Sequence, residues 1–279
     1  MATLIQSLQR VLERGDPMLP NQTRRIRLKA ALQAYVLDFL YNHRFYRRLN
    51  FYGGTCLRVI YDLNRLSEDI DLDNGREVDI NSLADDLREH FHARLAYRDL
   101  TISQRESGRG IVRITLKFPL LYTLGLSPHR DEKLHLKLEV SGHRQVAELK
   151  STPVIYFGRS FVPSHFSLET MMAGKILACL ERSFQVGATG TRIKGRDFYD
   201  LLWFMGQQIQ PLEEKLAQDS AQPYTVKTAM GALQEKVATI TPRDLAVDLL
   251  PLFEQRSFIE AWIETFHDTF EAYTRYYVG

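Results

Sequence analysis

The chain has 279 residues, of which 44% are hydrophobic and 25% charged, and this balance excludes a disordered chain, a fibre and a disulfide scaffold. Its 36 Lys and Arg against 34 Asp and Glu give a net charge of +2, which by itself predicts no strong affinity for nucleic acid. No apolar run approaches the roughly 18 residues of a membrane-spanning helix, and residues 1–20 lack the apolar core of a signal peptide. We therefore expect a cytoplasmic protein with no membrane partner and with reduced thiols at Cys56 and Cys179.

Hydrophobic periodicity predicts an order of elements that changes character near the middle of the chain. The first part mixes both kinds of element: helices are expected over 23–50, 55–62 and 79–96, and strands over 69–73, 111–118, 134–140 and 154–157. The strand pattern stops after Pro163. Later helices are expected over 168–183, capped by Ser167, and over 196–209, with further helix starts at Thr225, Thr241 and Ser257.

This distribution predicts an α+β fold in two parts. Strands and helices together form a mixed-sheet core over residues 1–160, which includes the N-terminal helix. An all-helical domain follows over residues 161–279, and we expect it to complete the active-site cleft. The length of the chain suits two domains of ordinary size.

A pair of carboxylates on the 69–73 strand is the first candidate site. Asp69 and Asp71 are two residues apart, so a strand places both side chains on one face. Neighbouring like charges are tolerated when a cation lies between them, and Mg²⁺ (or Mn²⁺) takes one or two carboxylates together with substrate phosphates. Glu139 can join the metal site if its strand is a neighbour, and two metals would then clamp an in-line phosphoryl displacement. The alternative is a solvated strand face.

The turn formed by Gly53 and Gly54 is the second candidate. Glycine lets the backbone approach a phosphate closely, and the start of the following helix offers free N–H groups. Thr55 adds a hydroxyl donor. An ordinary turn would also explain these three residues, but with two carboxylates on the next strand they favour a triphosphate held between donors and metal.

Lys175 lies in the middle of an apolar stripe on the 168–183 helix, which includes Met171, Met172 and Cys179. A lysine there is unfavourable unless it reaches a partner, so we expect it to point into the cleft and meet phosphate or carboxylate. A side chain that extends to the edge of the stripe is the alternative.

Acidic and basic residues surround the start of the next helix. Asp197 lies in its first turn, where an acid can simply complement the helix dipole, and Asp200 follows three residues later. The glycine-rich stretch 187–195 and its basic residues Arg192 and Lys194 could contact RNA phosphates or form a solvated connector.

Several of these residues belong to stretches that resemble one family. Residues 51–58 (FYGGTCLR) and 65–72 (RLSEDIDL) resemble the first motif of the AbiEii/AbiGii nucleotidyltransferase toxins, which include the MenT toxins and belong to the DNA-polymerase-β-like nucleotidyltransferase superfamily. Thr55 stands where many members have Ser. Three shorter stretches are similar to downstream motifs of the family, in the expected order: 137–139, 175–178 and 196–201. The resemblance therefore spans about residues 50–205.

The resemblance implies a metal-dependent enzyme that moves a nucleotide from an NTP to an acceptor. The implied acceptor is RNA, in particular the 3′ end of tRNA, and the implied role is the toxin of a toxin–antitoxin or phage abortive-infection system with a cognate antitoxin. The implied catalytic residues are Asp69, Asp71, Lys175 and Asp197, with Lys175 on the triphosphate and Asp197 orienting the lysine or the attacking hydroxyl. The implied nucleotide-binding residues are Gly53, Gly54, Thr55, Arg58, Lys137 and Lys175, and the metal ligands are Asp69, Asp71 and Glu139.

Two other functions remain open at this point. A kinase-like member would use the same metal and triphosphate geometry to phosphorylate a protein. A non-catalytic member would use the fold for binding alone, but such a protein should have lost at least one of Asp69, Asp71, Glu139 and Lys175.

Overall fold

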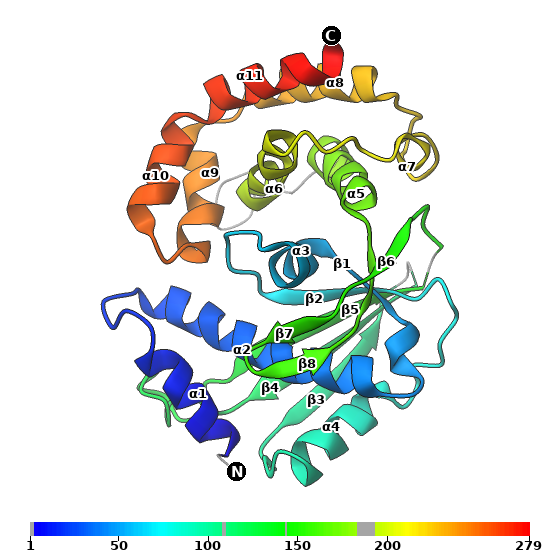
Figure 1. Ribbon diagram of the computed structural model, residues 1–279. Helices are drawn as coiled ribbons and strands as arrows, with labels where there is room; N and C mark the ends of the chain where they lie inside the picture. The colour runs from blue at the N-terminus through cyan, green and yellow to red at the C-terminus, as the bar shows by residue number, and fades with distance from the viewer. Residues whose placement is uncertain (1–2, 108–109, 143, 183–192) are drawn as a thin grey trace. The chain divides into compact units, whose positions relative to one another are not determined.

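The structure is a computed structural model that describes residues 3–107, 110–142, 144–182 and 193–279. It divides into two compact units, one made of Met1–Arg144 and Lys150–His165 and the other of Gln145–Leu149 and Phe166–Gly279. A mixed sheet with covering helices comes first and helices follow (Figure 1), which confirms the expected α+β class. Within the described residues, no helix is both long and apolar enough to cross a bilayer.

A seven-stranded sheet in the order β3-β4-β5-β2-β1-β9-β6 forms the centre of the α/β part. β2 pairs parallel with β5 and antiparallel with β1, so the sheet is mixed around its middle strand. A separate hairpin consists of β7 and β8. The strands are β1 Asn50–Tyr52, β2 Asp69–Asp73, β3 Thr101–Glu106, β4 Ile111–Phe118, β5 Leu134–Ser141, β6 Leu149–Ser151, β7 Val154–Tyr156, β8 Arg159–Phe161 and β9 Ser164–Phe166.

One face of this sheet is apolar and covered by helices. Successive side chains point to opposite faces of a strand, so Ile70 and Leu72 of β2 are fully buried while Asp69 and Asp71 are half-exposed, and only at the end of the strand is the alternate residue, Asp73, buried as well. α2 (Asn21–Asn42) contacts β5, α4 (Leu83–Ala93) contacts β3, and the two helices contact each other. α1 (Leu4–Glu13) and β8 also contact α2, which explains why apolar residues surround that helix.

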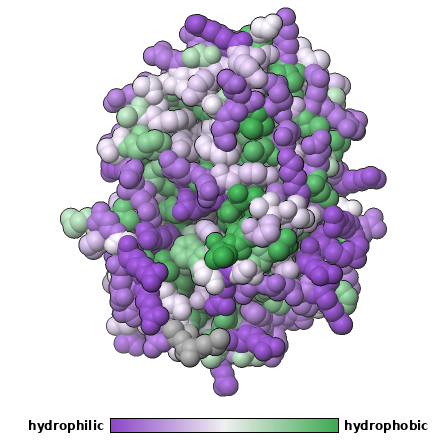
Figure 2. Space-filling view, in the orientation of Figure 1, coloured by the Kyte–Doolittle hydropathy of each residue, from purple (hydrophilic) through white to green (hydrophobic). Residues whose placement is uncertain are grey.

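Hydrophobic side chains also reach the surface on the β7–β8 hairpin and directly after it. Ile155 and Val162 are 81% and 53% exposed. Figure 2 shows a hydrophobic patch in the middle of the view, where Figure 1 places β7 and β8.

The helix expected over 23–50 is too long. It ends at Asn42, because His43 is extended, and a short 3-10 turn over Tyr46–Arg48 leads into β1. Leu49 and Phe51, which follow this turn, are fully buried. The helix expected over 79–96 is likewise shorter, and β1, β3, β6, β8 and β9 were not expected. β3 (TISQRE) contains one apolar residue, Ile102, and therefore has no apolar alternation to detect.

The second unit is helical around α5 and α6. Figure 1 shows these two helices enclosed by the later ones, and α5 contacts α6, α7 and α8. Ser167, Thr225 and Thr241 cap helices as expected, whereas Ser257 lies inside α10. The helices are α5 Leu168–Glu181, α6 Gly195–Gly206, α7 Glu213–Gln218, α8 Val226–Val237, α9 Pro242–Leu249, α10 Arg256–Glu264 and α11 Phe266–Val278.

Candidate active site

The glycine turn connects β1 to α3 (Gly53–Tyr61) and lies beside β2. Tyr52, the last residue of β1, pairs with Asp71 across the antiparallel ladder. Gly53 has φ +79°, a backbone conformation that side chains disfavour. A Cβ on Gly53 would also collide with the carboxylate of Asp71. Two independent constraints therefore require glycine here, and both keep the start of α3 close to the Asp71 carboxylate.

The two aspartates share the half-exposed face of β2. Asp69 and Asp71 alternate with buried Ile70 and Leu72, as the pattern predicted. The parallel register with β5 places Lys137 opposite Asp69 and Glu139 opposite Asp71. Two carboxylates on one accessible face suit Mg²⁺, which usually takes one or two protein carboxylates.

Glu139 is engaged by an arginine on the neighbouring strand. Arg113 of β4 lies opposite it, with Nη2 and Nε at 2.6 and 2.7 Å from Oε1 of Glu139. In the described part of the chain, no three His, Cys, Asp or Glu side chains lie close enough to hold a metal. The expected cluster of Asp69, Asp71 and Glu139 is therefore not assembled in this structure, because the cross-strand ion pair holds the Glu139 carboxylate.

Thr55 is placed beneath the site rather than on its surface. Its side chain is fully buried, and its hydroxyl donates to the backbone carbonyl of Asp69. Gln33 of α2 donates from Nε2 to this hydroxyl at 3.4 Å and to the carbonyl of Ser67 at 3.1 Å. The hydroxyl thus fixes the start of β2. The sequence analysis missed Gln33, and the available signal was a polar residue within the otherwise apolar stretch 30–37.

Two arginines lie near the glycine turn and the segment that leads into β2. Arg65 is 3% exposed, and a Cβ on Gly54 would come within 2.5 Å of its Nη2. Arg58, expected to bind nucleotide, donates from Nη1 to the carbonyl of Arg65 at 2.9 Å. Arg58 therefore braces the segment before β2, and the guanidinium of Arg65, which was not predicted, packs against Gly54. Lys137 is exposed on β5.

A buried ion group in the second unit contains the other predicted residues. Nζ of Lys175 lies 2.7 Å from Oδ1 of Asp197 and 2.9 Å from Oδ2 of Asp200. The three side chains are 13%, 5% and 0% exposed. The aspartates are three residues apart on α6, so they share one face toward α5. The carboxylate partner that the apolar stripe required for Lys175 is this pair.

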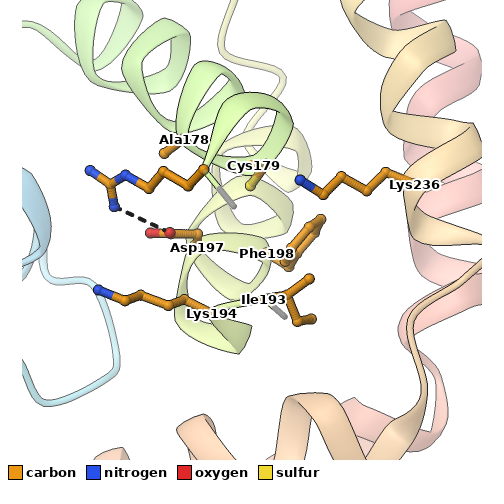
Figure 3. Close-up of a pocket in the computed structure, with 8 residues that line it drawn as sticks. Ala178, Cys179, Ile193, Lys194, Asp197, Phe198 and Lys236 are labelled. Carbon is orange, nitrogen blue, oxygen red and sulfur yellow. Dashed lines mark hydrogen bonds and ion pairs between the residues drawn. The ribbon is translucent and has the colours of Figure 1, made fainter. Parts of the chain in front are cut away.

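Asp197 stays ionised despite its burial. Burial raises its pKa, but Lys175 and then Arg182 outweigh that effect and hold the pKa of the carboxyl well below its ordinary value. Nη1 of Arg182 lies 3.3 Å from Oδ2 of Asp197. Asp197 lines a cavity of about 10 Å³, room for about one water molecule. Figure 3 shows Lys194 extending to the same side as Asp197. Arg192 and the stretch 187–192 lie outside the described residues.

Both groups fall within one family match. The family model described as the nucleotidyl transferase AbiEii toxin of a type IV toxin–antitoxin system matches residues 36–276. A solved structure from H. pylori, provisionally described as a nucleotidyltransferase, is 18% identical with a TM-score of 0.49. That similarity covers 89% of this chain and 92% of the other, and at this level it carries no information about activity. None of the curated proteins matches.

Proposed function

Because the chain belongs to the AbiEii family of nucleotidyltransferase toxins, we propose that it transfers a nucleotide from an NTP to RNA with the help of Mg²⁺ or Mn²⁺. The observation that carries this proposal is the position of the Asp71 carboxylate against Gly53, at the start of α3. Backbone donors and carboxylates thus meet on one accessible surface, as a metal-bound triphosphate requires.

The start of α3 supplies the phosphate-binding element of the proposal. The N-cap residue Tyr52 makes no side-chain cap bond to this helix, and the N–H groups of a first helical turn have no partners within the helix itself. Helix N-termini attract anions through such donors, and Gly53 and Gly54 leave the backbone open to close approach. Lys137, exposed beside Asp69, adds a positive charge for the triphosphate.

Asp69 and Asp71 would hold the metal, which when bound neutralises the triphosphate and favours in-line displacement. Glu139 joins them only if its ion pair with Arg113 opens. In the proposed reaction an acceptor hydroxyl forms a bond to the α-phosphorus, the bond to the β-phosphate bridging oxygen breaks, and pyrophosphate leaves while the hydroxyl proton passes to water or a carboxylate.

Lys175 is proposed to contact the triphosphate, with Asp197 and Asp200 fixing the direction of its ammonium. The support is that Lys175 is held by two carboxylates at 2.7 and 2.9 Å and is therefore ordered and charged. A charge that is already oriented needs no reorganisation during the reaction.

The proposed acceptor is the 3′ end of tRNA, and the proposed setting is the cytoplasm, where NTPs and tRNA are abundant. Family membership makes the chain the toxin of a type IV system, which implies an antitoxin. Modification of tRNA would block translation and so account for toxicity.

Two labels decide between the possible reactions. The protein is incubated with Mg²⁺, total RNA and each NTP in turn, labelled on either the α- or the γ-phosphate. We expect α-label on RNA and no transfer of γ-label, with Asp69→Asn as the inactive control. γ-Label on protein would instead identify a kinase, and no label from any NTP would overturn the proposal.

A further inference from the structure

Three cross-strand rows of side chains lead away from the carboxylates across the exposed face of the sheet. Paired residues on neighbouring strands share a face, so the register defines each row. The rows are Asp69–Lys137–Thr115–Ser103, Asp71–Glu139–Arg113–Arg105 and, beside them, His135–Lys117–Thr101. β3, β4 and β5 thus extend the surface on which Asp69 and Asp71 lie.

These rows are basic and accessible within the first unit. His135, Lys137 and Arg105 are exposed, Lys117 is half-exposed, and the side chain of Arg113 is 55% exposed. Alternate residues point to the opposite, buried face. Glu139 is the one acid that these rows contain on β3, β4 and β5, and Arg113 neutralises it.

The positive charges on this face lie close enough together to change the pKa of a residue within it. Partial desolvation lowers the pKa of His135, although the residue remains exposed, and four lysines lower it further: Lys117, Lys29, Lys137 and Lys133. Lys29 is paired with Glu68 at 2.6 Å. Lys133 is exposed and lies two residues before His135, so it extends the basic face beyond the end of β5.

We propose that this face, defined by Arg105, Arg113, Lys117, Lys133, His135 and Lys137, binds the sugar–phosphate backbone of the RNA acceptor and directs its end to Asp69 and Asp71. The inference rests on the proposed function. Strands lie about 4.8 Å apart, so basic groups stand at roughly 5, 10 and 14 Å from β2. A chain of phosphates that crosses the strands meets a cation at each step.

The accompanying residues favour RNA over an acidic protein. Thr101, Ser103 and Thr115 place hydroxyl groups between the cations, and hydroxyls together with Arg and Lys are the usual partners of phosphate oxygens. The face also begins at the carboxylates where the acceptor hydroxyl would react.

The test measures the binding of labelled tRNA to the inactive Asp69→Asn protein at about 50 to 200 mM salt. Arg105→Gln, Lys117→Gln and Lys133→Gln are added together. Each lost phosphate contact should reduce the slope of log K against log salt by roughly 0.7 to 0.9, so the triple change should reduce it by about 2 to 3 and raise Kd at least tenfold.

The matched control changes three exposed arginines outside the sheet, Arg10, Arg14 and Arg47, to glutamine. It loses the same charge and should retain the parent's slope. An unchanged slope in the first triple variant, an equal loss in the control, or binding of an acidic protein in place of tRNA would overturn the inference. If no label is transferred but tRNA binds this face, only the proposed reaction fails. If label is transferred while the triple variant binds as its parent does, only the inference fails.

Discussion

The two groups of predicted residues use aspartate in opposite ways. Asp69 and Asp71 lie half-exposed on a strand whose backbone is fixed from below by Thr55. Asp197 and Asp200 are buried on a helix and matched by Lys175. A carboxylate on an accessible face can accept a ligand without disturbing the core. A buried carboxylate must be neutralised inside the protein, so its partner becomes part of the fold.

The comparison predicts that the β2 carboxylates matter for activity and little for stability. Asp69→Asn should reduce transfer by about 1000-fold or more, because it removes a charge that the metal and triphosphate require. The midpoint of unfolding in urea should stay close to that of the parent. The exposed Asp131→Asn serves as the control. Parent-like transfer by the Asp69→Asn protein would remove this pair from the active site.

Gly53 sharpens the same comparison because two effects can be separated there. Gly53→Ala should cost backbone strain of roughly 1–3 kcal/mol at φ +79°, and should displace the Asp71 carboxylate. We expect transfer to fall by about 100-fold. Gly125→Ala is the matched control, since Gly125 has φ +69° with open space around its Cβ position. It should show the strain without the loss of transfer, and an equal loss of transfer in both variants would disprove the role of the contact with Asp71.

Lys175 tests the buried side of the comparison. Lys175→Met removes the ammonium group that both buried carboxylates contact, so stability should fall by about 3 kcal/mol, and transfer by about 10- to 100-fold. A methionine would suit the apolar stripe, but Asp197 and Asp200 would lose the cation that neutralises them. Adding Asp200→Asn to Lys175→Met should restore much of the stability without restoring transfer. Recovery of both would reduce Lys175 to a structural role.

The sequence could predict what depends on local pattern. The bounds of β2 and the shared face of Asp69 and Asp71 follow from alternation over five residues. The ion pair of Glu139 with Arg113 depends on a cross-strand register, and the bond from Gln33 to Thr55 joins residues 22 positions apart. Short strands such as β1 carry too few residues for periodicity. The sequence pattern therefore could not identify partners that tertiary packing brings together, even where it identified the residue itself.

The smallest effect concerns the dependence of stability on pH. The folded pKa of Asp197 is depressed, so between the folded and unfolded values the unfolded chain binds more protons than the folded one. The stabilisation is therefore complete above the unfolded value of about 3.9 and decreases as the pH falls below it. Unfolding free energies measured from pH 6 downward should converge for the parent and Asp197→Asn, because acid removes from the parent the ion pair that the variant already lacks.

Convergence separates this ion pair from a general effect of acid. Asp85 provides the control, because it is 75% exposed and paired with Arg88 on the surface of α4, where an ion pair contributes little. The difference between the parent and Asp85→Asn should be small at every pH. If the difference between the parent and Asp197→Asn also stayed constant down to the lowest accessible pH, the buried group would stabilise the fold through packing and hydrogen bonds rather than through charge. Asp197 would then differ from the aspartates of β2 in its burial and not in the contribution of its charge to stability.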